Sequence, residues 1–80
     1  MNLVELTEFI VKNLVTDPES VSVREFDDEE YKIIEVIVSD DDMKKVIGKN
    51  GKIANAMRTI IQASSYVSGE KKVKINIDSL

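Results

Sequence analysis

The sequence predicts an α+β fold in which three helices lie on one face of a three-stranded sheet. Apolar side chains recur every three or four residues in 3–15 and again in 53–67, a spacing typical of amphipathic helices. Three other segments alternate apolar and polar residues or are rich in β-branched ones, which is typical of strands. These segments are 21–26, 31–39 and 73–77. Helices and strands of this kind pack as two layers.

The chain is expected to begin with a helix that Pro18 ends. A proline inside a helix removes a hydrogen bond, and the residue before it avoids the helical region, so Asp17-Pro18 favours an extended or turn exit. The predicted core face, with its flanks, consists of Leu3, Val4, Leu6, Phe9, Ile10, Val11, Leu14 and Val15.

Two strands are expected next, joined by the acidic turn 27–30. The first covers 21–26, where Val21 and Val23 alternate with polar residues, and the second covers 31–39. In the second strand, alternate side chains point to opposite faces. One face would hold Ile34, Val36 and Val38, and the other Ile33 and Ile37.

The second half of the chain predicts helix, helix and strand. Asp40, Asp41 and Asp42 offer N-cap acceptors for a short helix over 43–46. A longer helix follows, and Gly69 is placed to end it. The half-buried strand 73–77 is expected last. The core face predicted for the long helix is Ile53, Ala56, Met57, Ile60, Ser64 and Val67.

The most informative segment is the glycine-bounded loop 48–51, with the sequence Gly-Lys-Asn-Gly. Glycines at both ends permit a tight turn and a close approach of the backbone to a ligand. The helix that follows begins with unpaired amides and a positive dipole end, which suit a phosphate. Lys49 and Lys52 add full positive charges. A bare G-x-x-G is also compatible with a purely structural turn, but the apolar and basic residues around it favour phosphate binding.

The loop lacks the features of nucleotide-triphosphate sites. A P-loop requires G-x-x-x-x-G-K followed by serine or threonine, and here Gly51-Lys52 is followed by Ile53. The dinucleotide fingerprint G-x-G-x-x-G is absent too.

The charge is divided unevenly along the chain. The net charge of −4 consists of −10 on residues 1–42 and +6 on residues 43–80. This asymmetry predicts a basic face on an acidic protein, and a basic face is the usual electrostatic feature of nucleic-acid binding.

Composition argues against catalysis and against a bound cofactor. The sequence contains no histidine, cysteine or tryptophan, so it lacks the usual general base, the thiolate nucleophile and the soft metal ligands. The aspartates at 40–42 lack calcium-loop spacing. We therefore expect neither an enzyme, a cofactor nor a metal site. An apolar run long enough to cross a membrane is also absent from the sequence, which predicts a cytoplasmic setting.

The order of elements, with Val46-Ile47-Gly48-Lys49-Asn50-Gly51-Lys52-Ile53 between the two later helices, resembles the type II KH domain. The resemblance covers nearly all of residues 1–80 and is closest to the small bacterial single-KH-domain proteins of the KhpA (YlqC) family. It implies a single-stranded RNA-binding protein of the cytoplasm, acting in RNA regulation or chaperoning. It also implies a homodimer, or association with a larger Jag-type KH protein. A KH loop of this kind clamps about four nucleotides.

The resemblance assigns RNA contacts around the loop. The expected contact residues are Val46, Ile47, Gly48, Lys49, Asn50, Gly51, Lys52 and Ile53. Lys44, Lys45 and Arg58 either extend this basic surface or are solvated helix residues. Lys71, Lys72 and Lys74 are expected to be edge-strand charges rather than contacts. Aromatic stacking is expected to be minor, because Phe9, Phe26, Tyr31 and Tyr66 are scattered along the sequence.

Self-association has one candidate patch. On a helical wheel, Ala54 and Ile61 lie beside the predicted core face of the long helix, toward Arg58. They either widen the core or form an apolar patch that pairs with a second KH domain.

Two other functions remain open from the sequence. The chain could be a protein-interaction module with incidental RNA binding, which its acidic total charge favours slightly and its intact loop opposes. Single-stranded DNA is the other alternative, since nothing in the sequence reads a 2′-hydroxyl.

Overall fold

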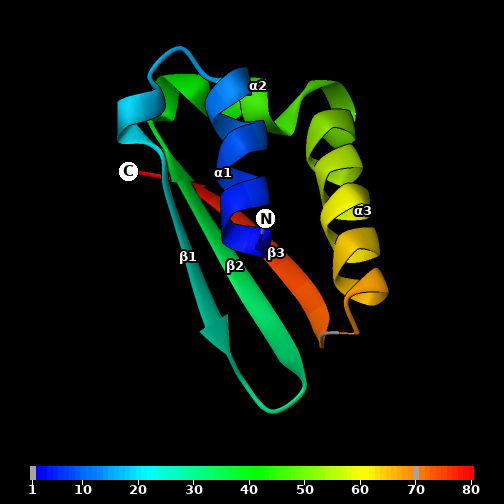
Figure 1. Cartoon of the computed structure of the whole chain (residues 1–80). Coiled ribbons are helices and arrows are strands. Elements are labelled where there is room, and N and C mark those ends of the chain that lie inside the picture. Colours follow the sequence, from blue (N-terminus) through cyan, green and yellow to red (C-terminus); the bar gives the residue numbers. More distant parts are fainter. Residues whose placement is uncertain (1, 70) are drawn as a thin grey trace.

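The computed structural model describes residues 2–69 and 71–80 and confirms the predicted α+β fold (Figure 1). Its elements are the helices α1 (Leu3–Leu14), α2 (Met43–Ile47) and α3 (Lys52–Val67), and the strands β1 (Ser22–Asp27), β2 (Tyr31–Val38) and β3 (Lys72–Ser79). Short 3₁₀ turns cover Pro18–Ser20, Asp40–Asp42 and Lys49–Gly51. The order is the predicted one, and each boundary lies within two residues of the expected position.

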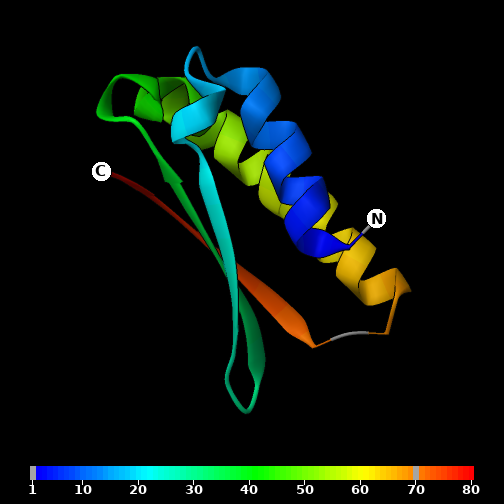
Figure 2. The ribbon, with the colours of Figure 1, turned by 60° about the vertical axis from the view of Figure 1, so that its left-hand side comes forward.

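The sheet has the strand order β1-β2-β3. β1 and β2 form an antiparallel hairpin, whereas β2 and β3 run parallel. Parallel neighbours require a crossover connection, which α2 and α3 supply. Figure 2 shows all three helices on one side of the sheet, with the other side left uncovered.

The core lies between the helices and the sheet. From β2 it takes Ile34, Val36 and Val38, as predicted, and β3 adds Val73 and Ile75. The remaining buried apolar side chains of this core are Leu3, Val11, Val46, Met57 and Ile61.

The predicted core face of α3 is wrong. Ile60 is 52% exposed and Ile53 is 37% exposed, whereas Ile61 is fully buried. The buried residues of this helix are Ala54, Met57, Ile61 and Ser65. The helix is therefore rotated by about one residue, or roughly 100°, from the orientation that its apolar side chains indicate. Phe9 on α1, predicted at the flank of the core, is 61% exposed.

Polar contacts between α3 and β3 explain this rotation. Arg58 Nε donates to the carbonyl oxygen of Ile75 at 3.4 Å, and Gln62 Nε2 donates to that of Val73 at 3.2 Å. Ser65 Oγ donates to the carbonyl oxygen of Lys71 at 2.8 Å. Residues spaced by three or four lie on one side of a helix, so this row turns the side carrying 58, 62 and 65 toward β3.

The proposed dimer patch on Ala54 and Ile61 is contradicted by the same rotation. Ala54 is 2% exposed and Ile61 is not exposed at all, so neither side chain is available to a second chain. The alternative interpretation, in which both residues belong to the core, is correct.

Asp42 does not cap α2 as predicted. Its side chain is buried and accepts hydrogen bonds from the segment that follows α1. Thr16 donates to Oδ1 through its hydroxyl at 2.7 Å and its amide at 3.1 Å. The amide of Asp17 and the hydroxyl of Ser39 donate to Oδ2, each at 3.1 Å. Asp42 thus joins the end of α1 to the start of α2. The contacts with Thr16 hold the pKa of Asp42 at about 2, below its ordinary 3.8.

We expect this carboxylate to make folding sensitive to acid. Because the folded-state pKa is lower than the unfolded one, the contribution of Asp42 is complete above 3.8 and is lost as the pH falls toward about 2. Replacing Asp42 with Asn should lower the melting temperature at neutral pH, because the NH2 group that replaces one carboxylate oxygen would face a donor, the amide of either Thr16 or Asp17.

Thermal melts at a series of pH values test this. The difference in melting temperature between wild type and Asp42→Asn should narrow as the solution is acidified. Asp28→Asn is an exposed comparison: hydrogen bonds from the amides of Tyr31 and Glu30 also lower the pKa of Asp28, so its difference from wild type should narrow in the same direction but be smaller at neutral pH. If the difference in melting temperature between wild type and Asp42→Asn stayed constant across these pH values, the proposed contribution of the Asp42 carboxylate to stability would be contradicted.

Candidate nucleic-acid interface

The glycine-bounded loop lies between α2 and α3, at the end of the molecule where β2 and β3 finish (Figure 1). α2 ends at Ile47, and the amide of the next residue, Gly48, donates to the carbonyl oxygen of Lys44 at 2.9 Å. The amide of Gly51 in turn donates to the carbonyl oxygen of Gly48 at 3.2 Å. These two bonds close the turn before α3 begins.

Three of the four loop residues have positive φ angles. The values are 78° for Gly48, 57° for Asn50 and 74° for Gly51. Glycine adopts this region without penalty, and asparagine tolerates the left-handed region better than most residues do. The sequence Gly-Lys-Asn-Gly thus matches the backbone that the turn requires.

Gly48 also has no room for a side chain. A Cβ built on it would lie 2.6 Å from Cγ1 of Ile53 and 2.9 Å from its backbone nitrogen. Gly51 is less crowded, since a Cβ there would meet only Nδ2 of Asn55, at 3.8 Å. The first glycine therefore lets the loop fold against the start of α3, and the second is required mainly for its φ angle.

The start of α3 has its positive end next to the loop. The residue before the helix, Gly51, has no side chain to cap it, and the amide of Lys52 donates to the carbonyl oxygen of Lys49. The amides that follow carry the positive end of the helix dipole. Lys49, Asn50 and Lys52 are exposed around them. A hollow of about 370 Å³ opens beside the loop, lined by Met43, Lys44, Ile47, Gly48 and Lys49. This arrangement suits an anion such as a phosphate.

The structure does not place all predicted contact residues on this surface. Val46 is fully buried in the core, so its predicted contact with RNA is wrong. Ile47 is half-buried and lines the hollow, and Ile53 is partly exposed. The predicted contact residues that remain accessible to RNA include the loop residues and their apolar neighbours Ile47 and Ile53.

The three additional basic residues differ in their surroundings. Lys44 is exposed and lines the same hollow. Lys45 is exposed but lies 3.8 Å from the carboxylate of Asp42. Arg58 is half-buried, and its guanidinium donates to the carbonyl of Ile75 and to Oδ1 of Asn55. Lys44 is therefore the best placed to add charge at the loop.

A second hollow was missed by sequence reasoning. It gathers Tyr31, Tyr66 and the lysines at 71, 72 and 74, where α3 ends and β3 begins. Lys74 Nζ lies 4.1 Å from the centre of the Tyr31 ring. These residues come from three separate elements, and no local motif links them. The available signal in the sequence was the position of Tyr66, a few residues before the lysines at 71, 72 and 74.

The fold and the loop together define a type II KH domain. The family model described as KhpA/KhpB, KH domain, matches residues 4–77. The chain belongs to this family.

Sequence relatives agree with this assignment. The chain is 49% identical over 73 residues to the "RNA-binding protein KhpA" of Clostridium perfringens, covering 91% of this chain and 96% of the relative. It is 37% identical over 71 residues to the protein of the same name from Thermotoga maritima, covering 89% and 95%.

Solved structures of the protein Era share the fold. Aquifex aeolicus Era bound to GDP and AlF4⁻ superposes with a TM-score of 0.72 at 15% identity, over 98% of this chain. Era in complex with MgGDPNP and nucleotides 1506–1542 of 16S ribosomal RNA gives a TM-score of 0.65 at 17% identity, over 96% of this chain. The chain spans only 30% and 29% of these two Era chains, so the likeness concerns that part of each.

Proposed function

We propose that this protein binds single-stranded RNA through the loop 48–51, clamping about four nucleotides of the sugar–phosphate backbone. The observation that carries the proposal is the combination of Gly48 and Gly51 at positive φ with the uncapped start of α3. The name of the relatives, RNA-binding protein KhpA, supports RNA as the ligand.

Each loop residue has a distinct role in this proposal. Gly48 and Gly51 let the nucleic-acid backbone approach the turn, and the amides at the start of α3 donate to a phosphate. Lys49, Asn50 and Lys52 supply further donors and charge. Ile47 and Ile53 offer apolar contact to a base beside the loop.

Binding of this kind is expected to be modest and moderately sensitive to salt. With about two to four neutralised phosphates, the logarithm of the binding constant should fall with a slope of about −1.4 to −2.8 against the logarithm of salt. Fluorescence anisotropy of a labelled single-stranded RNA, at several salt concentrations, measures this slope. Unlabelled duplex RNA should compete poorly, because paired bases cannot enter a clamp built for splayed ones. Equal competition by duplex RNA would contradict the proposal.

Association with a second KH domain is a further part of the proposal. Ile60 is 52% exposed and Val67 is 85% exposed, and the two residues lie two helical turns apart on α3. An apolar stripe of this kind suits a homodimer, or a larger Jag-type KH partner. Two linked RNA sites would bind a longer RNA more tightly through effective concentration, as RNA regulation or chaperoning requires. Sedimentation of the wild-type chain tests the homodimer.

A protein-interaction module is the second candidate function, and the same exposed stripe is the observation that favours it.

The family is one of binding proteins, and nothing in the described residues suggests a reaction. Those residues form no group of acidic side chains suited to a metal ion. The described part of the chain also has no helix with the length and apolar character needed to cross a membrane.

A further inference from the structure

The second hollow lies at the opposite end of α3 from the glycine-bounded loop (Figure 1). Its volume is about 470 Å³, which makes it larger than the hollow beside the loop. α3 has 16 residues, so the two ends of the helix are separated by about 24 Å at ~1.5 Å per residue. The hollow is therefore a separate feature of the surface and not part of the loop.

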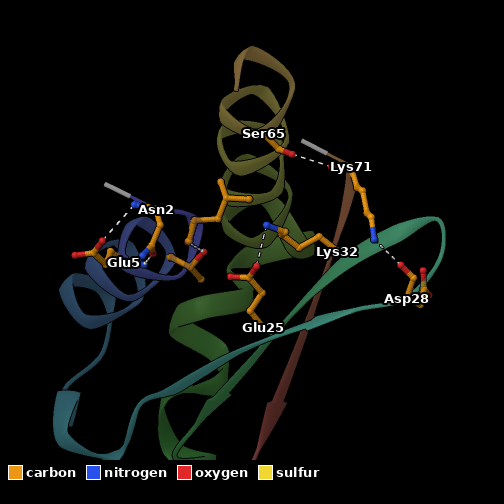
Figure 3. A network of polar contacts seen from close by, with 9 residues as sticks. Asn2, Glu5, Glu25, Asp28, Lys32, Ser65 and Lys71 are labelled. Atoms are coloured by element: carbon orange, nitrogen blue, oxygen red, sulfur yellow. Dashed lines mark hydrogen bonds and ion pairs between the residues drawn. The ribbon is translucent and has the colours of Figure 1, made fainter. Parts of the chain in front are cut away.

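The walls of this hollow are held by hydrogen bonds between distant segments. Ser65 Oγ donates to the carbonyl oxygen of Lys71, and Lys71 Nζ donates to that of Asp28 at 2.8 Å (Figure 3). Gln62 donates to the carbonyl of Val73 at the start of β3. These bonds join α3, β3 and the turn after β1, so the hollow is preformed. The carbonyls of Val73 and Ile75 in β3 already accept from Gln62 and Arg58. A peptide strand added to this edge would have to displace these bonds, so it is a poor alternative.

The hollow combines aromatic rings with positive charge. Tyr66 is 86% exposed, so its ring is available to stack on a planar group. Lys72 is exposed, and Lys74 lies over the Tyr31 ring. The acidic turn residues Asp28, Glu29 and Glu30 lie beside Tyr31 and Lys74, and Asp28 also contacts Lys71, so Lys72 is the lysine farther from this turn. Positive charge next to an aromatic face is the combination that binds single-stranded nucleic acid without sequence preference.

We infer that this hollow binds a nucleotide of the same RNA strand, outside the stretch held at the loop. Its base stacks on Tyr66, and its phosphate lies against Lys72. The inference rests on the proposed RNA-binding function and extends it to a second contact on one domain. RNA is favoured over an acidic peptide because Lys52 and Lys72, both exposed, place positive charge near the start and the end of α3. A strand held at the loop thus meets positive charge at both ends of this helix.

Binding of a short and a long RNA separates the two contacts. Fluorescence anisotropy is measured with single-stranded RNAs of about four and about twelve nucleotides, the shorter one matching the loop alone. Tyr66→Ser should weaken binding of the longer RNA about fivefold or more, and leave the shorter one unchanged. Tyr66→Phe keeps the ring and should bind both RNAs like wild type. Lys72→Gln should reduce the salt slope for the longer RNA by about 0.7, the value of one phosphate contact.

The outcomes distinguish this inference from the function on which it rests. Lys12→Gln removes the same charge from α1 and should leave the salt slope of both RNAs unchanged. If wild type binds both RNAs, and neither Tyr66→Ser nor Lys72→Gln affects the longer one, the second contact is overturned while the loop proposal stands. Equal weakening of both RNAs by Tyr66→Ser also overturns it, because the effect would then not depend on reach. If wild type binds neither RNA, both proposals fail together.

Discussion

Replacing Lys49 and Asn50 together with aspartate is expected to reduce the affinity for single-stranded RNA about a hundredfold or more, or about 2.7 kcal/mol. Both side chains are exposed and neither contributes to the core. Aspartate tolerates the left-handed conformation of residue 50 nearly as well as asparagine does, so the loop should keep its shape. Two negative charges would then face the phosphate at the start of α3.

The chain contains a matched control for this change. Lys12-Asn13 is the same dipeptide, exposed on α1, so Lys12→Asp with Asn13→Asp makes the same change in total charge. We expect this control to weaken binding only slightly, through the general field of the protein. Circular dichroism should confirm that both variants remain folded. If the two double variants lose affinity equally, total charge and not the loop would govern binding.

The second large effect is a difference in stability between two adjacent isoleucines. Ile61→Ala should lower the free energy of unfolding by about 2–5 kcal/mol, because it leaves a cavity in the core. Ile60→Ala should lower it by about 1 kcal/mol or less, since half of that side chain is already exposed. Urea denaturation followed by circular dichroism measures both values. A larger loss for Ile60→Ala would mean that α3 is oriented as its apolar pattern suggests.

Aspartate at the same two positions tests the role of the exposed stripe. Ile61→Asp buries a charge and should prevent folding, whereas Ile60→Asp should fold. If α3 pairs with a second chain, sedimentation of Ile60→Asp should show a monomer at concentrations where wild type is a dimer. Protein concentration must be held constant in the stability measurements, since dimerisation adds to the apparent stability.

Local chemistry explains why the elements and the loop could be predicted. α1 ends at Leu14, ahead of Pro18, which begins the 3₁₀ turn Pro18–Ser20. Gly69 follows the long helix with a φ of 71°, as expected for a residue just past a helix end. In the same way, alternation along 31–39 correctly predicted the buried face of β2. Each of these features depends on residues close together in the chain.

The orientation of α3 could not be predicted in this way. Its two candidate faces share Met57, and the face that carries Ile53 and Ile60 has more apolar surface than the face that the structure buries. Hydrogen bonds favour the face that the structure buries: Gln62 donates to the carbonyl of Val73 in β3, and Ser65 donates to that of Lys71, the residue before β3. Periodicity contains no information about such partners.

The sequence by itself determined the order of helices and strands, the turn at 48–51 and the concentration of basic residues after residue 42. Only the tertiary structure decided that Asp42 turns inward, bonding to a threonine 26 residues away, and that Tyr31 and Tyr66 meet the lysines of β3 in one hollow. Local backbone preferences act between neighbours in the chain, so they can be read from the sequence. Burial of a charge and formation of a surface hollow depend on which distant segments pack together, and that is settled by the free energy of the whole fold.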